Sequence, residues 1–177
     1  MAKLKKMQGR LEDPSVQALM ELIPTQNRET LARWAIDWVR DHCLSIWTAD
    51  FPDDNRPARA LEAGVVYYST GRKTPAIREA IAAATAAARE ADNGEHPAAV
   101  AAARAIATAA AILQTPTNAL GYTFYAAAAY AYSSAGPDQK QAVYDSLASR
   151  ELRQMLLALQ RIAVEGVSDP VTVTWNC

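Results

Sequence analysis

The residues that could do chemistry are densest in the segment DFPDDNRPARALEAG, which begins at Asp50. The segment contains the aspartates Asp53 and Asp54, followed by the cations Arg56 and Arg59. Two carboxylates can act as general acid and base when both reach one atom. Adjacent side chains at the start of a helix point in different directions and rarely converge in this way. We therefore favour a structural role for this pair, as a helix cap with ion pairs to the two arginines.

Few other residues have the spacing that a catalytic or metal site needs. His42 and His96 are the only histidines, and neither has a partner at metal-ligand spacing. The serines lack the glycine pattern of a nucleophile elbow, and no glycine-rich phosphate loop is present. The tyrosines between residues 122 and 132 have helical spacing, which favours core packing over a stacking platform for a ligand. The sequence therefore predicts a protein that is not an enzyme and holds no metal and no cofactor.

Composition also restricts the kinds of partner. The chain has 18 Lys and Arg residues against 19 Asp and Glu residues, which leaves a net charge of −1. Such a chain has no strong field to attract nucleic acid or an anionic membrane. The N-terminus has no secretory apolar run, no longer apolar span follows, and Cys43 and Cys177 share no motif. We expect a cytoplasmic protein with reduced thiols that binds neither nucleic acid nor a membrane.

The elements that position these residues are predicted to be helices. Alanine, the best helix former, supplies 38 of the 177 residues, and strand-like alternation is nearly absent. Half of the residues are apolar, which is enough for one core in a single domain spanning residues 1–177. Apolar spacings and Pro, Gly and Asn breaks separate six to eight helices. The predicted fold is an all-α, alanine-rich, compact bundle.

The same signals give helix boundaries. The first helix follows Asp13 and ends at Pro24, and a wide apolar stripe over residues 31–47 predicts one long second helix. For residues 138–167 the apolar phase predicts a helix with a break near 146–149. The other predicted helices lie near residues 57–70, 75–91, 97–114 and 118–135. Residues 168–177 are predicted to form an extended arm or a frayed end.

The segment PDDNRPARALEA carries the most specific pattern in the chain. With Asp53, Asp54, Arg56, Pro57 and Glu62, it resembles the Pro-Asp-Asp-x-Arg-Pro-x-x-Ala-Ile-Glu-Ala pattern of a bacterial family, the immunity-type-five-like proteins of polymorphic-toxin systems. The similarity continues through the alanine-rich segments AAVAAARAIATAAA and NALGYTFYAAAAYA. The similarity is strongest over residues 30–135 of the chain.

This resemblance implies an all-helical protein that binds a cognate protein toxin and neutralises it by forming a stoichiometric complex. The candidate partner-binding residues are Asp50, Asp53, Asp54, Arg56 and Arg59. Exposed aromatic side chains could supply buried anchors for such a complex. Two alternatives remain open: a helical scaffold or assembly subunit that forms a homo-oligomer, and a small-molecule enzyme whose site residues are distant in sequence.

Overall fold

The structure is a computed structural model that describes residues 4–175. Its helices are α1 (Pro14–Leu22), η1 (Ile23–Thr25, a 3-10 turn), α2 (Arg28–His42), α3 (Leu44–Asp50), α4 (Arg56–Thr70), α5 (Pro75–Glu90), α6 (Pro97–Ala110), α7 (Asn118–Ala135) and α8 (Gln141–Ile162). No strand occurs within residues 4–175. The expected all-α bundle of six to eight helices is therefore confirmed, with eight α-helices among the described residues.

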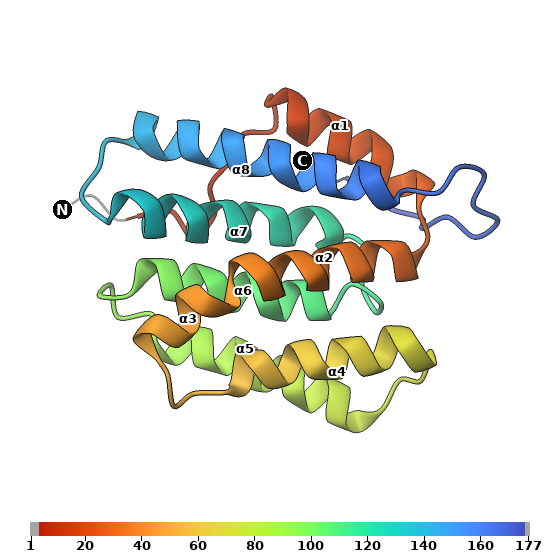
Figure 1. Cartoon of the computed structure of the whole chain (residues 1–177), viewed down its shortest axis with the longest axis horizontal. Coiled ribbons are helices and arrows are strands. Elements are labelled where there is room, and N and C mark those ends of the chain that lie inside the picture. Colours follow the sequence, from red (N-terminus) through yellow and green to blue (C-terminus); the bar gives the residue numbers. More distant parts are fainter. Residues whose placement is uncertain (1–3, 176–177) are drawn as a thin grey trace.

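The helices are stacked in layers (Figure 1). Helices α1 and α8 lie at one end of the stack, α4 and α5 lie at the other, and α2, α6 and α7 lie between them. Helix α6 contacts α2, α3, α4, α5 and α7 and so forms the centre of the bundle. No helix within the described residues is long and apolar enough to cross a membrane.

Small residues explain how α6 can have so many neighbours. Its buried positions are Ala99, Val100, Ala101, Ala102, Ala103, Ala105, Ile106, Ala107, Ala109 and Ala110. Alanine side chains allow helix axes to approach towards the short end of the usual 8–10 Å range. Gly64 on α4 serves the same purpose, because a Cβ there would lie 2.8 Å from Cδ1 of Ile36. Small side chains at the helix contacts therefore allow the helices to pack closely.

The prediction of one long helix over residues 31–47 is wrong. Helix α2 ends at His42, and α3 begins at Leu44 after the buried Cys43. The two helices bury different tryptophans: Trp34 packs in the main core, and Trp47 packs with the alanines of α5 and α6. On one straight helix these two side chains would point about 140° apart. The bend at Cys43 lets both of them be buried.

The predicted break near residues 146–149 is also wrong, because α8 continues without interruption for 22 residues. Its buried stripe contains Tyr144, Ala148, Leu152, Met155 and Leu159. These positions keep helical spacing throughout, with Ala148 carrying the stripe across the expected break. The apolar residues Val143 and Leu147 do not belong to this stripe, because Val143 is exposed and Leu147 is only half-buried.

Both ends of the described chain lie against the helices. Residues 4–13, here called the N-terminal strap, are held by the buried Gln8, whose Nε2 donates to the Tyr132 hydroxyl at 2.7 Å. At the other end, the Val171 amide donates to the carbonyl of Gln26 at 2.8 Å, and the Trp175 indole donates to the carbonyl of Met20. Residues 176–177, including Cys177, lie outside the described part of the chain.

Candidate functional site

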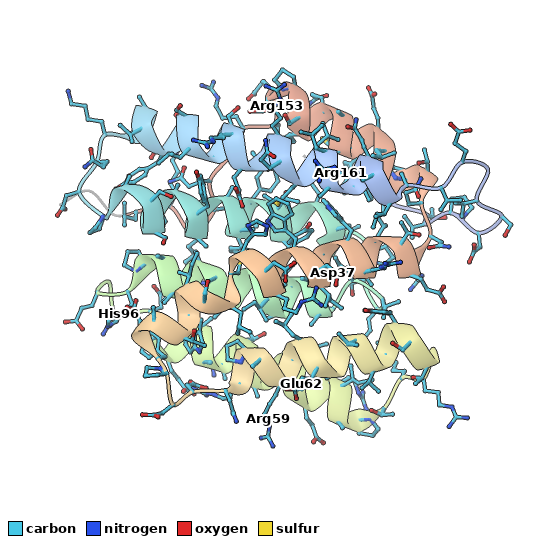
Figure 2. All side chains as sticks on the ribbon, viewed as in Figure 1. Asp37, Arg59, Glu62, His96, Arg153 and Arg161 are labelled. Atoms are coloured by element: carbon cyan, nitrogen blue, oxygen red, sulfur yellow. The ribbon has the colours of Figure 1, made fainter. Side chains whose placement is uncertain are left out.

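Two turns that are distant in sequence meet at one end of the bundle. One joins α3 to α4 at residues 51–55, and the other joins α5 to α6 at residues 91–96. His96 Nδ1 lies 3.0 Å from Oδ2 of Asp50, and the His96 ring meets the Phe51 ring edge-on at 4.9 Å. Figure 2 shows His96 at this end of the molecule. The Trp47 and Phe51 rings stack beneath the junction at 4.4 Å.

Carboxylates are concentrated around this junction, which we call the acidic edge. Its members are Asp50, Asp53, Asp54, Glu90, Asp92 and Glu95. All except Asp54 are exposed. The edge therefore combines a short segment that precedes α4 with the end of α5 and the turn that follows it.

Arg56 ties the two halves of the acidic edge together. Its guanidinium binds both carboxylate oxygens of Asp54, with Nη2 at 2.7 Å from Oδ2, and Nη2 also donates to Oε2 of Glu90 at 2.8 Å. The hydrogen bonds from Arg56 lower the pKa of both carboxyl groups, and the two carboxylates raise the pKa of Arg56. This bridge joins the start of α4 to the end of α5.

Asp54 also organises the entry to α4. Its Oδ1 accepts the backbone N–H of Arg56 at 3.1 Å, and its carbonyl accepts the Trp47 indole N–H at 2.8 Å. The N-cap position itself is Asn55, whose side chain makes no cap hydrogen bond, so Asp54 acts from one residue earlier by accepting the first free N–H of the helix. The predicted acceptance of a first-turn N–H is confirmed for Asp54, and the predicted ion pair is confirmed for Arg56.

The structure separates the five residues that the sequence singled out. It brings Asp50, Asp54 and Arg56 into the contacts described above. Asp53 and Arg59 are exposed and make no ion pair within residues 4–175, and Asp53 does not cap α4. Figure 2 shows Arg59 on the outer side of α4, pointing away from the bundle.

Sequence reasoning missed the second half of the edge. The Asn, Gly and Pro residues at 93–97 indicate only a break between helices, and His96 has no metal-ligand partner in the sequence. The useful signal was that two acidic turns each precede a helix with proline in its first turn, at Pro57 and Pro97. The pairing of the α3–α4 and α5–α6 turns depends on the packing of α3 against α6, which the sequence does not display.

A second group of polar residues lies inside the bundle. Glu151 on α8 is only 6% exposed, and burial raises its pKa to about 7. Burial also raises the pKa of Cys43 and of Tyr122, and the charge of Glu151 adds to both effects. The Tyr122 hydroxyl has no hydrogen-bond partner among the described residues. The sequence signal for Glu151 was its place in the buried stripe, three residues after Ala148 and four before Met155.

The described residues do not assemble a metal site. Within residues 4–175, no group of three or more His, Cys, Asp and Glu side chains is arranged to hold a metal ion. His42 lies away from the acidic edge and stacks on Trp38 with a ring separation of 4.0 Å. Among the described residues the acidic edge is one of two sets of linked ion pairs, and the other joins Arg33, Asp37, Arg40 and Asp41 along α2.

Comparison with known proteins assigns the chain to a family. Searches against curated proteins and against solved structures found no match. A family model described as "Imm-5 like putative immunity protein" matches residues 21–158, which include both turns of the acidic edge. The match covers most of the chain and agrees with the resemblance seen in PDDNRPARALEA. The chain belongs to the Imm-5 like immunity protein family.

Proposed function

We propose that this protein neutralises a cognate bacterial protein toxin by forming a stoichiometric complex, with the acidic edge as the contact surface. Family membership supports the immunity role. The observation that carries the choice of surface is the meeting of two acidic turns around Arg56 and His96. A patch in which six carboxylates outnumber the two arginines bound to them, Arg56 and Arg104, on a chain with a net charge of −1 points to a local partner contact.

The edge has both fixed and available charges. Arg56, bound to Asp54 and Glu90, holds the two turns in one arrangement before any partner arrives. Asp53 and Glu95 remain exposed and can accept basic groups of the partner. A surface that is already ordered loses less conformational entropy on binding. Such a surface favours a tight complex with a basic region of the toxin.

An aromatic residue at the edge could anchor the complex. Phe51 is half-buried, stacks on Trp47 and meets the His96 ring edge-on. Interfaces commonly draw their affinity from a few aromatic anchors within a polar rim. In this proposal the protein acts by covering the toxin, without turnover, metal or cofactor.

Co-expression tests the proposal. The chain is produced with the toxin encoded beside its gene, and survival and complex formation are both measured. A matched pair of variants locates the surface: Asp53→Lys with Glu95→Lys at the edge, and Glu165→Lys with Asp169→Lys as the control. The control residues are equally exposed and lie in the turn after α8, at the opposite end of the molecule in Figure 1.

We expect the wild type and the control variant to protect the cell and to copurify with the toxin. The edge variant should protect the cell less well and copurify with less toxin than the control variant. Protection by the wild type without any complex would contradict binding as the mechanism. Equal loss in both variants would contradict the choice of surface.

A further inference from the structure

A hollow of about 470 Å³ lies next to the acidic edge. The N-terminal strap lines one side, the turn at residues 92–97 and the start of α6 line another, and Tyr132 of α7 and Pro137 complete the wall. His96 belongs to both features, because it lines the hollow and contacts Asp50 on the edge. The hollow and the acidic edge are therefore parts of one continuous surface.

The hollow has the opposite charge to the edge. Its lining contains the cations Lys5, Lys6 and Arg104 and a single carboxylate, Asp92. Asp92 is already bound to Arg104 at 2.7 Å, whereas Lys5 and Lys6 are exposed. Apolar side chains form much of the remaining lining: Leu4, Pro97, Val100, Ala101 and Pro137. The chemistry suits an apolar side chain that is flanked by carboxylates.

The cationic side of the hollow is held in place by the strap. The Tyr132 hydroxyl donates to the carbonyl of Lys5 at 2.7 Å, and Gln8 binds the same hydroxyl. The backbone that carries the lysines is thus fixed to α7, while their charged ends remain exposed. Lys5 and Lys6 precede the region that the family model matches, residues 21–158. The two lysines therefore lie outside the matched region, whereas Arg104 and the rest of the wall from Asp92 to Pro137 lie inside it.

We propose that this hollow receives an acidic segment of the same toxin, with an apolar side chain inside it and carboxylates on Lys5 and Lys6. The inference rests on the proposed function and makes the strap a determinant of partner choice. Two neighbouring surfaces of opposite sign accept a partner in one orientation only, because the reversed orientation would place like charges together.

The first test uses a short peptide as the probe. The acetylated peptide Glu-Glu-Leu-Glu-Glu is titrated into the isotopically labelled full chain, with Lys-Lys-Leu-Lys-Lys and Ser-Ser-Leu-Ser-Ser as charge controls. Amide signals of Val100, Ala101 and Arg104 report on the hollow. The variant Lys5→Glu with Lys6→Glu reverses the cationic side. Its matched control reverses the exposed pair Arg72 and Lys73, in the loop between α4 and α5.

We expect the acidic peptide alone to shift the signals of the hollow. The strap variant should weaken this binding about three- to tenfold, as the loss of two exposed charge pairs implies, and the Arg72 and Lys73 variant should not. Equal weakening by both variants would overturn the site. Tighter binding of a single-stranded oligonucleotide of equal charge would overturn the assignment to an acidic protein segment.

The second test separates this inference from the proposed function. The wild type and the two charge-reversed variants are titrated with the co-expressed toxin. If the wild type binds and the strap variant binds equally well, the hollow is not a partner site and the proposed function stands. If the wild type does not bind the toxin, the proposed function fails, and the assignment of the hollow to a segment of that toxin fails with it. The peptide result then reports only on the charge preference of the hollow.

Discussion

The acidic edge and the interior around Glu151 place the same chemical group in opposite environments. At the edge, Asp54 and Glu90 share the Arg56 guanidinium, which lowers the pKa of both carboxyl groups. Glu151 has a buried carboxyl among apolar helices, and burial raises its pKa to about 7. The folded protein favours the charged form at the edge and the neutral form inside.

This contrast separates carboxylates whose charged form the fold stabilises from a carboxyl whose charged form the fold opposes. An exposed carboxylate keeps its hydration and contributes little to folding, so it is free to meet a partner. A buried carboxyl must be neutral or pay the cost of desolvation. Perturbed pKa values often accompany function. In this chain the most perturbed carboxyl lies away from the surface that a partner can reach.

The largest effect is expected for Glu151→Gln. Burial raises the pKa of Glu151 from its ordinary value of 4.5 to about 7 in the folded protein. The stability that its neutral form contributes is therefore fully present below pH 4.5 and is lost as the pH rises through about 7. Glutamine has no such loss, so the variant should gain on the order of 3 kcal/mol in unfolding free energy at pH 8 and little at pH 4. Denaturant unfolding at both pH values measures this difference.

The exposed Glu62→Gln on α4 is the control and should behave like the wild type at both pH values. If Glu151→Gln changes stability equally at pH 4 and pH 8, the carboxyl does not titrate as its burial implies.

A smaller loss is expected for Asp54→Ala. The substitution removes the acceptor of the Arg56 backbone N–H at the start of α4 and the bidentate contact with Arg56, and it should lower the unfolding free energy by about 0.5–2 kcal/mol, the usual range for losing a side-chain acceptor at a helix start. The neighbouring Asp53→Ala should change stability by less than about 0.5 kcal/mol, because Asp53 is exposed and unpaired within residues 4–175. Thermal unfolding of both variants checks this, and equal losses would contradict the role of Asp54 at the start of α4.

Two interior tyrosines extend the comparison to neutral groups. The Tyr132 hydroxyl donates to Lys5 and accepts from Gln8, so Tyr132→Phe should cost about 1 kcal/mol. The Tyr122 hydroxyl is buried without a partner among the described residues, so Tyr122→Phe should leave stability unchanged or slightly raise it. Chemical denaturation distinguishes the two, and a matching loss for Tyr122→Phe would show that its hydroxyl is hydrogen-bonded in solution.

Local chemistry explains which features were predictable from sequence. The alanine content and the Pro and Gly breaks were enough to predict the helical fold. Asp54 followed by Arg56 and Pro57 was enough to predict where α4 begins. The bend at Cys43 was missed because one apolar stripe can be buried by a straight or a bent helix. Whether the helix is straight or bent depends on which neighbouring helices Trp34 and Trp47 pack against.

The candidate site was only half predictable for a related reason. The contacts between Arg56 and Glu90 and between Asp50 and His96 join residues 34 and 46 positions apart. They depend on how α3, α5 and α6 pack, and no local pattern encodes that packing. The basic hollow depends on three separate parts of the chain, namely the strap, α6 and α7, and was missed for the same reason.

Calorimetric titration with the cognate toxin tests the central claim, that the acidic edge binds the toxin, most directly. The account predicts a one-to-one complex with the wild type and unchanged affinity for the Glu165→Lys, Asp169→Lys control. The Asp53→Lys, Glu95→Lys variant should bind about tenfold more weakly, because two exposed contacts become repulsive, while its unfolding free energy stays within about 0.5 kcal/mol of the wild type. Equal affinity of the edge and control variants, or protection of the cell without a measurable complex, would contradict the account.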